Sequence, residues 1–176
     1  MTDDKHKVKT IIAAYLGTFD PITLGHFDII SRAATIFHTL YIGIGTNKEK
    51  KNFFSVAERM AIIHDVCRNL PNVKVKAFSG LAVDFAKAVD ASVLVRGLRT
   101  EADFVYELQM AMMNRTLDMA IDTVFVPTRQ DLSHVSSSLV KEVALLGGNV
   151  HKLVPAVVAV ALRKQVKKIK KVAGNG

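Results

Sequence analysis

The sequence predicts an α/β protein built on a parallel β-sheet, and three observations support this prediction. Short apolar runs rich in β-branched residues alternate with segments that have the period of amphipathic helices. The first run, Ile11–Leu16, is continuously apolar, as expected of a strand buried on both faces of its sheet. The strand–helix alternation repeats along the chain, which is typical of parallel strands joined by helical crossovers.

Loop composition and helix-capping residues mark the limits of the first two strand–helix units. The strand Ile11–Leu16 leads through a loop of Gly, Pro, Asp and Thr into a helix over 25–37, which carries apolar residues at helical spacing. The second strand, Thr39–Gly45, is followed by a polar, lysine-rich loop. Ser55-Val56-Ala57-Glu58 has the spacing of a capping box, which opens a helix that extends to about Asn69.

The rest of the chain continues the alternation. Leu70-Pro71-Asn72 stops the second helix, and Val73–Phe78 alternates apolar residues with lysine, as a strand does. Two further strands are expected at Ser92–Arg96 and Ile121–Val126. Further helices are expected at Leu81–Val89, 100–117, Ser136–Leu146 and Val157–Lys171. The pattern predicts a single Rossmann-like domain with a five-stranded parallel sheet and helices on both faces.

Composition agrees with one folded domain and excludes several other classes. The 176 residues are 49% hydrophobic and 23% charged, as in ordinary globular proteins. The single cysteine, Cys67, forms no internal disulfide, and the scattered histidines lack zinc-site spacing. The N-terminus is unlike a signal peptide, and the apolar run Val154–Leu162 is too short to span a membrane. We expect a cytoplasmic protein with a flexible N-terminus (1–10) and a domain over 11–162.

The net charge of +8 is concentrated at the C-terminal end. Six of the 24 basic residues lie in the basic tail, residues 163–176, which contains no acid. The remainder has 18 basic against 16 acidic residues. We interpret the tail as a solvated helix end, with a weak polyanion contact as the alternative. No RNA-binding motif or aromatic platform supports nucleic-acid binding as the main function.

The loop after the first strand has the composition of a phosphate site. Ligands of open parallel sheets bind beyond the carboxyl ends of the strands. Here the sequence GTFDPITLGH, residues 17–26, provides glycines that let backbone approach a ligand. Free N–H groups at the start of a helix favour phosphate, and the ring of His26 can donate to a phosphoryl oxygen. The loop is neither a GxxxxGK[ST] nor a GxGxxG motif.

Three later loops can bring charge and hydroxyl groups to the same crevice. They contain a lysine cluster (Lys48, Lys50, Lys51), the segment Arg96-Gly97-Leu98-Arg99, and the helix start Ser136-Ser137-Ser138. Lysine and arginine suit phosphate, and hydroxyls at a helix start form a second anion site. Solvated lysines, arginines paired with acids of the next helix, and simple helix capping are the plainer alternatives.

Two features of the 100–117 helix leave alternatives open. A stripe of methionines, Met110, Met112 and Met113, is more typical of a core or a subunit interface than of a ligand pocket. Asp103 and Glu107 lie one turn apart, which fits a solvated helix face. The same two carboxylates could also accept hydrogen bonds from a nucleotide.

The segments GTFDPITLGH, KKNFFSVAER, VLVRGLRTEADFVYELQMAMMNR and SSSLVKEVA together resemble the bacterial phosphopantetheine adenylyltransferases. These are nucleotidyltransferases with an (H/T)xGH signature, related to the class I aminoacyl-tRNA synthetases, and Thr23-Leu24-Gly25-His26 is that signature with Thr first. The resemblance extends from about residue 11 to residue 160. It implies that ATP adenylylates 4′-phosphopantetheine, giving 3′-dephospho-coenzyme A and pyrophosphate, by in-line attack without a covalent intermediate. This is the penultimate step of coenzyme A biosynthesis.

The same resemblance implies three groups of site residues. Those taking part in the transfer would be His26, Lys50, Thr18 and Arg99. ATP would be bound by Thr18, Phe19, His26, Gly97, Leu98, Arg99, Glu107, Leu132, Ser133, His134, Val135, Ser136, Ser137 and Ser138. 4′-Phosphopantetheine would be bound by Thr18, Lys50, Leu81, Ala82, Arg96, Met110, Met113 and Asn114. The sequence departs from the family pattern at Leu132 and His134, where aromatic residues are usual, and at Leu16 and Ala82.

The resemblance also implies Mg²⁺ held mainly by ATP phosphates and water, a homohexamer, and feedback inhibition by coenzyme A. The attacking phosphate is already ionised near neutral pH, so positioning and charge neutralisation suffice and no general base is required. The alternatives are another adenylyl- or cytidylyltransferase of this superfamily, a nucleic-acid-binding protein and an inactive homologue.

Overall fold

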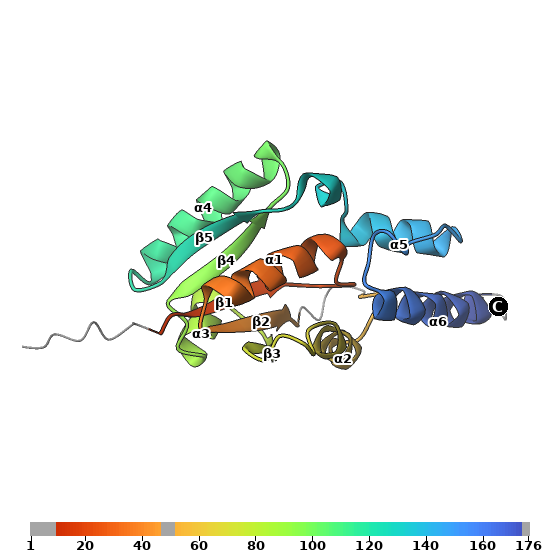
Figure 1. The fold of residues 1–176 in the computed structure, drawn as a ribbon, viewed down its shortest axis with the longest axis horizontal. Coiled ribbons are helices and arrows are strands. Elements are labelled where there is room, and N and C mark those ends of the chain that lie inside the picture. The colour runs from red at the N-terminus through yellow and green to blue at the C-terminus, as the bar shows by residue number, and fades with distance from the viewer. Residues whose placement is uncertain (1–9, 47–51, 174–176) are drawn as a thin grey trace, which may run out of the picture.

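The computed structural model describes residues 10–46 and 52–173 of the chain (Figure 1). The described residues form five strands: β1 (Ile12–Gly17), β2 (Thr39–Gly45), β3 (Val73–Phe78), β4 (Val93–Leu98) and β5 (Asp122–Pro127). The helices are α1 (Leu24–Ile36), α2 (Val56–Val66), α3 (Ala82–Ala88), α4 (Glu101–Leu117), α5 (Ser137–Leu145) and α6 (Ala156–Ala173), with a 3₁₀ turn at Gln130–Leu132. The predicted single α/β domain is confirmed.

The strand order places a topological switch at the centre of the sheet. All strands are parallel, in the order β3-β2-β1-β4-β5, so the chain reverses its direction of travel across the sheet between β1 and β4. β1 pairs with β2 along its whole length but with β4 only over Ala13–Tyr15. The carboxyl ends of β1 and β4 therefore separate, and a crevice opens between them.

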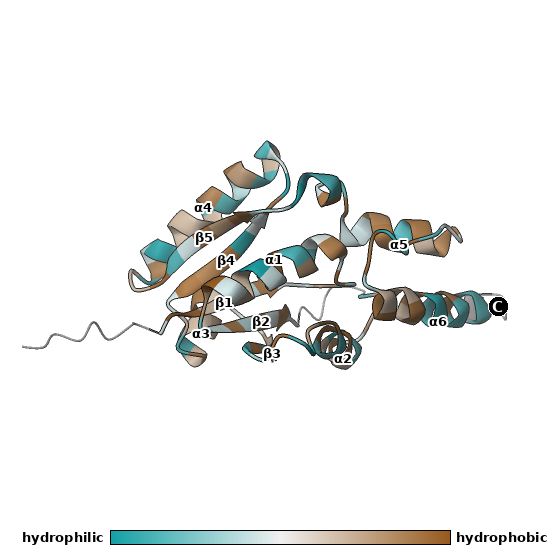
Figure 2. Cartoon of the chain, in the orientation of Figure 1, coloured by the Kyte–Doolittle hydropathy of each residue, from teal (hydrophilic) through white to brown (hydrophobic). Residues whose placement is uncertain are grey.

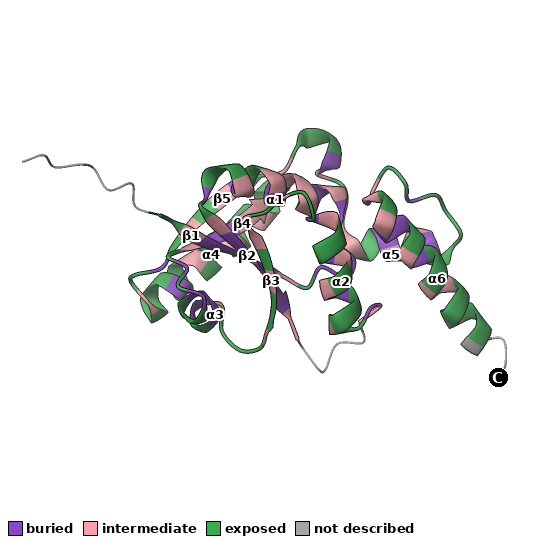
Figure 3. Ribbon diagram, turned by 60° about the horizontal axis from the view of Figure 1, so that its bottom comes forward, coloured by how far each residue is buried: buried purple, intermediate pink, exposed green. Residues whose placement is uncertain are grey.

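Alternating residues of the central strand serve two cores. Ala13 and Tyr15 of β1 face the larger core, to which α1, α2, α5 and α6 contribute apolar residues. Ala14 and Leu16 face the opposite core, which α3 covers. α4 lies against β4, β5 and α3. Figure 3 shows the buried residues gathered in the central strands, with exposed residues along much of α6.

α4 leaves much of its apolar surface uncovered in a single chain. Of its residues only Asn114 is buried. Val105, Tyr106, Met112 and Met113 are all more than half exposed. The methionine stripe of the sequence analysis, Met110, Met112 and Met113, is exposed, so a single copy of the chain does not bury it.

The element bounds follow the sequence signals closely. β2 and β3 have the predicted limits, whereas β4 continues to Leu98, so Gly97 belongs to the strand and not to a loop. α2 ends at Val66, before the predicted Asn69. α6 changes from apolar at its start to polar toward its end, as Figure 2 shows, and the basic residues from Arg163 onward are exposed. In the described residues no helix is long and apolar enough to cross a membrane.

Candidate active site

A pocket of about 350 Å³ lies where β1 and β4 separate. Its walls come from the end of β1 and the following loop, the start of α1, the end of β4, the first turns of α4, and the start of α5. A second hollow of about 400 Å³ adjoins it and shares four of its residues: Phe19, His26, Ser137 and Ser138. The site is thus a pair of connected hollows at the switch point of the sheet, where such folds bind ligands.

His26 is oriented by the cap of its own helix. Thr23 is the N-cap of α1, and its side chain accepts a hydrogen bond from the His26 backbone N–H at 3.3 Å. In return, the Thr23 backbone N–H donates to His26 Nδ1 at 3.1 Å. The T-x-x-H spacing of the signature is therefore a capping box with imidazole at the N3 position, where Glu or Gln is usual. Because Nδ1 accepts this hydrogen bond, the proton of the neutral ring resides on Nε2.

The environment keeps this imidazole neutral. Burial, and to a smaller degree the positive charge of Arg99, lowers the pKa of His26 to about 4. The ring packs edge-on against Phe19, with centroids 5.2 Å apart. The site therefore presents a neutral N–H donor across the physiological pH range, beside the N-terminal end of a helix.

A buried arginine fixes the loop that precedes α1. Arg59 of α2 is 1% exposed, and its Nη1 donates to the carbonyl oxygens of Thr18 at 2.6 Å and Gly45 at 3.2 Å. The same loop places Phe19 in the left-handed region, with φ of 48°, which is costly for a residue with a side chain. Arg59 thus joins the ends of β1 and β2 at the point where this strained backbone enters the pocket.

A buried carboxylate fixes the other side of the same loop. Asp20 is 3% exposed, and its two oxygens accept the backbone N–H groups of Phe53 at 2.7 Å and Phe54 at 2.9 Å. Lys141 of α5 lies 3.5 Å from Asp20 Oδ2 and lines the second hollow. An ammonium group therefore lies in the same hollow as His26, next to a carboxylate that backbone N–H groups already bind.

Arg96, near the end of β4, is held across the pocket by α4. Its Nε and Nη2 donate to the two oxygens of Glu107 at 2.5 and 2.7 Å, and Nη1 donates to the carbonyl of Leu16 at 3.2 Å. Burial acts to lower the pKa of Arg96, but the hydrogen bonds and charge of Glu107 outweigh it and raise the pKa. The guanidinium is thus a permanent cation in the wall of the pocket.

The second arginine of this segment is similarly paired. Arg99 Nε lies 3.0 Å from Asp103 Oδ2, one turn along α4, and Nη2 lies 3.2 Å from Oδ1. Asp103 and Glu107, one turn apart on α4, therefore serve as counter-ions for the two arginines of β4. The sequence left two alternatives for these arginines, a place in the phosphate site or pairing with acids of the next helix. The structure shows both at once, because the arginines line the pocket and are paired with acids of α4.

Between the two arginines, Gly97 lets α1 approach the strand closely. A Cβ atom on Gly97 would lie 2.3 Å from Ile29 Cδ1 and 3.3 Å from the hydroxyl oxygen of Tyr15. The first distance is a steric clash, and the second is a tight contact with an oxygen atom. Glycine at this position allows Ile29 and Tyr15 to form the wall of the pocket beside Arg96.

The start of α5 closes the site from the other side. Ser136 is the N-cap, and its side chain accepts the Leu139 backbone N–H at 3.2 Å. Ser137 Oγ donates to the Pro21 carbonyl at 2.8 Å, which ties α5 to the loop before α1. Two helix N-termini, those of α1 and α5, thus face the same pocket and favour an anion there.

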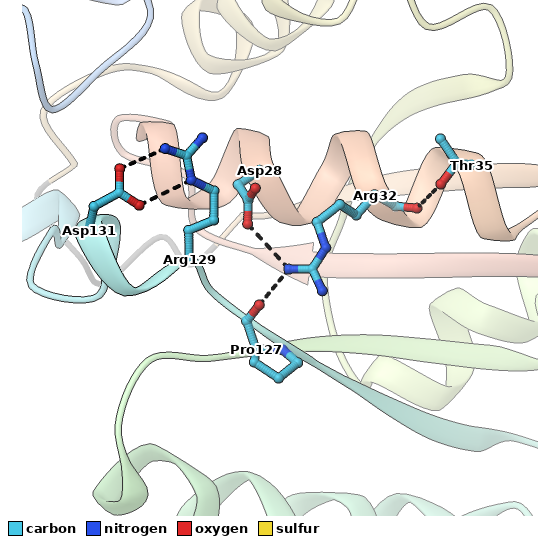
Figure 4. A network of polar contacts seen from close by, with 6 residues as sticks. All are labelled: Asp28, Arg32, Thr35, Pro127, Arg129 and Asp131. Carbon is cyan, nitrogen blue, oxygen red and sulfur yellow. Dashed lines mark hydrogen bonds and ion pairs between the residues drawn. The ribbon is translucent and has the colours of Figure 1, made fainter.

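Exposed ion pairs fix the rim beside the pocket (Figure 4). Arg32 of α1 donates to the carbonyl oxygen of Pro127 at 2.6 Å and pairs with Asp28 at 3.4 Å. Arg129 and Asp131 form a two-point pair in the loop after β5. These contacts hold α1 against the end of β5, where Thr128 reaches the pocket wall.

The structure brings together many, but not all, of the residues expected in the site. The expected residues that line one or both hollows are Thr18, Phe19, His26, Arg96, Gly97, Arg99, Glu107, Val135, Ser136, Ser137 and Ser138. Those that line neither hollow are Leu81, Ala82, Leu98, Met110, Met113, Asn114, Leu132, Ser133 and His134. Leu132 packs in the larger core, and Leu81 is half exposed. Lys50 lies outside the described residues.

Several lining residues were missed by the sequence interpretation. In the sequence Tyr15 is an ordinary strand residue, and no motif indicates a role for Asp20, Thr128 or Lys141, yet all four line the hollows. Lys141 had a usable signal, because it follows Ser138 by three residues on the helix whose N-terminus faces the pocket. Asp20 had none, since its partners are backbone groups more than 30 residues away.

The fold and the site together indicate the class of protein to which the chain belongs. A Rossmann-like sheet whose switch point carries two helix N-termini, two arginines and a neutral imidazole is a site for the phosphates of a nucleotide. The family model for cytidylyltransferase-like proteins matches residues 14–143, so the chain belongs to this family, within the nucleotidyltransferase superfamily. It is a nucleotidyltransferase-type enzyme.

A solved structure agrees with this assignment at the level of the fold. The chain is similar to a putative nicotinate-nucleotide adenylyltransferase from Vibrio parahaemolyticus, with a TM-score of 0.67 and 15% sequence identity. The match covers 89% of this chain and 94% of that one. The two proteins share a fold over nearly their whole lengths.

Proposed function

We propose that the chain transfers the adenylyl group of ATP to 4′-phosphopantetheine. A phosphate oxygen of phosphopantetheine bonds to the α-phosphorus, the bond to the bridging oxygen breaks, and pyrophosphate leaves with the electron pair. The observation that carries the proposal is the convergence of His26, Arg96 and Arg99 in one pocket. These residues come from the GTFDPITLGH and RGLR segments, whose combination resembles phosphopantetheine adenylyltransferases.

The residues of the two hollows supply the functions that this reaction needs. His26 Nε2–H donates to phosphoryl oxygens as their charge develops, and its neutrality makes it a fixed dipole. Arg99, the serines at the start of α5 and Lys141 surround the β- and γ-phosphates. Arg96 binds the phosphate of the acceptor, and Thr18 lies beside the reacting groups, in the second hollow. Lys50 is proposed to bind both the attacking phosphate and the α-phosphate.

Mg²⁺ is part of the proposal as an ion that ATP brings with it. Within residues 10–46 and 52–173, no group of three or more His, Cys, Asp and Glu side chains is arranged to hold a metal. The pocket carboxylates Asp103 and Glu107 are already paired with arginines. This donor set fits an ion held mainly by phosphate oxygens and water, which would offset charge on the leaving pyrophosphate.

The proposal extends to assembly, regulation and location. The exposed apolar residues of α4 support an oligomer, and we assign a homohexamer. Coenzyme A, which has the pantetheine arm of the product, is assigned as a feedback inhibitor. The cytoplasm is assigned as the location.

The test is pyrophosphate release from the purified protein with ATP, Mg²⁺ and 4′-phosphopantetheine, with dephospho-coenzyme A identified by mass. The expected product requires both substrates and is lost in His26→Ala. Nicotinate mononucleotide, nicotinamide mononucleotide and phosphocholine serve as competing acceptors. Turnover with one of these and none with phosphopantetheine would keep the nucleotidyl transfer and overturn the proposed acceptor.

A further inference from the structure

We infer that Arg59 is a positioning residue for the proposed adenylyl transfer, because it fixes the peptide group between Thr18 and Phe19 at the edge of the site. The inference rests on the proposed function and gives a role to a residue that lines neither hollow. Arg59 lies on α2 and reaches the site through the carbonyl oxygen of Thr18.

The guanidinium group of Arg59 is a costly feature of the core. The residue is 1% exposed, and its Nε and Nη2 atoms find no hydrogen-bond partner within residues 10–46 and 52–173. Burial lowers the pKa of Arg59, against the opposing effect of the Asp20 charge. A buried cation matched at one nitrogen generally stabilises a fold less than an apolar side chain of similar volume does. Packing alone therefore does not account for an arginine here, and its contacts with two carbonyl oxygens are what distinguish it.

Those contacts join two strand ends. Arg59 Nη1 donates to the carbonyl of Thr18 at 2.6 Å and to that of Gly45 at 3.2 Å. Gly45 is the last residue of β2 and is held in the sheet opposite Phe78 of β3. Thr18 directly follows β1, whose pairing with β2 ends at Gly17. Arg59 therefore ties the position of the Thr18 carbonyl to the end of the neighbouring strand.

Fixing this carbonyl also fixes the N–H group on the other side of the same peptide. The Thr18–Phe19 peptide is trans, so the N–H of Phe19 points away from Arg59. No backbone carbonyl of the described residues accepts a hydrogen bond from this N–H. Since Phe19 lines both hollows, the orientation that Arg59 imposes leaves a backbone donor for an anion bound there.

The same contact bears on the imidazole of His26. The backbone of Phe19 has a φ of 48°, a conformation that persists only where the surroundings hold it. Its ring packs edge-on against that of His26, with centroids 5.2 Å apart. Without Arg59 Nη1 the strained peptide can relax, which displaces both the Phe19 N–H and the ring beside His26. A displacement of about 1 Å in groups that bind developing charge is enough to lower a rate about a hundredfold.

The test compares two variants of α2 by steady-state kinetics and chemical denaturation. Arg59→Met removes the guanidinium and keeps an apolar stem in the core. Ile63→Val, at a residue that is 0% exposed on the same helix, removes one methyl group and leaves the Thr18 contact in place. We expect Arg59→Met to lower kcat about tenfold to a hundredfold, with both KM values within about threefold of wild type, because Arg96 and Arg99 remain to bind the substrates. Ile63→Val should lower the unfolding midpoint and keep the wild-type kcat.

Arg59→Lys is the conservative variant, and it decides the case in which Arg59→Met does not fold. Its ammonium group keeps a donor on a stem that differs in length and shape from that of arginine, so kcat should fall only about threefold to tenfold at unchanged KM. A wild-type kcat in Arg59→Met, or in Arg59→Lys where the first variant does not fold, would overturn the inference. So would a fall in kcat that Ile63→Val shares at an equal loss of stability.

Failure of the proposed function is recognised separately, because the wild type then shows no turnover with phosphopantetheine. In that case the wild type and the folded Arg59 variant are titrated with inorganic pyrophosphate, and the Phe19 amide is followed by NMR. A smaller chemical-shift change of this amide in the variant supports the positioning role, and equal changes in the two proteins contradict it.

Discussion

Arg96 and Glu107 form a two-point contact in the wall of the candidate active site. Arg96 Nε donates to Glu107 Oε2, and Arg96 Nη2 donates to Glu107 Oε1. The helix that follows β4 therefore carries the counter-charge for a cation at the end of that strand. A phosphate entering the site meets an arginine whose orientation is already fixed by this fork-to-fork contact. Glu107 thus fixes the orientation of the Arg96 guanidinium, which would otherwise be mobile.

Arg96→Lys should weaken the acceptor site while keeping its charge. Lysine is a point charge that cannot match both oxygens of Glu107 and a phosphate at once. We expect KM for the phosphorylated acceptor to rise by about tenfold or more, with a smaller change in KM for ATP. Steady-state kinetics with each substrate varied separately measure this. Arg68→Lys, at an exposed pair on another face, is the control and should change neither constant.

His26 combines a structural and a chemical role, and two variants separate them. His26→Ala removes both the capping hydrogen bond and the Nε2–H donor, so it should lower unfolding free energy by about 1 kcal/mol and turnover by orders of magnitude. His26→Gln keeps a residue that suits position N3 of a capping box. It should recover most of the stability but little of the turnover. Equal loss of ATP affinity and of rate in His26→Ala would contradict a role in the transition state.

The neutral state of His26 gives a pH dependence of stability with a definite sign. Its pKa is lowered to about 4, mainly by burial, so the folded protein binds this proton less readily than the unfolded chain does. The stabilisation should be complete above about pH 6.5 and be lost as pH falls from there toward 4. NMR titration of the imidazole should give the low midpoint. Subtraction of the His26→Gln denaturation curves isolates its share of stability, and a midpoint near 6.5 would contradict the burial.

Gly97→Ala should lower the free energy of unfolding, mainly because the new methyl group would clash with Ile29. Its Cβ would stand 2.3 Å from Ile29 Cδ1, so the helix or the strand must shift, at a cost of about 1–3 kcal/mol. Ile29→Val removes that methyl group. The double variant should therefore regain part of the stability lost in Gly97→Ala, which chemical denaturation of the four proteins can measure. Additive losses in the double variant would show that Ile29 is not the obstacle.

Much of the fold is present in local sequence patterns. The apolar run at β1, the alternation at β3 and the capping box Ser55–Glu58 at the start of α2 indicate their elements without tertiary information. The convergence of His26 with Arg96 also follows from pattern, because both come after parallel strands at the switch point.

The remaining features depend on how the elements meet. Tyr15 reads as a core residue, and its access to the pocket depends on β1 parting from β4 just beyond it, which no periodicity reveals. The side chain of Leu132, a residue that the family resemblance assigns to ATP, packs in the larger core at the end of the 3₁₀ turn Gln130–Leu132, and no local pattern indicates this. The buried Asp20 carboxylate and the Nη1 atom of the buried Arg59 bind backbone groups distant in sequence, so their role could not be deduced from residue type.

The loop between β1 and α1 is held by Arg59 at Thr18, by Asp20 at the backbone of Phe53 and Phe54, and by Ser137 at Pro21. Its loss of conformational entropy is therefore incurred when the chain folds and not when a nucleotide arrives. Association should then be a single bimolecular step, without a slow rearrangement.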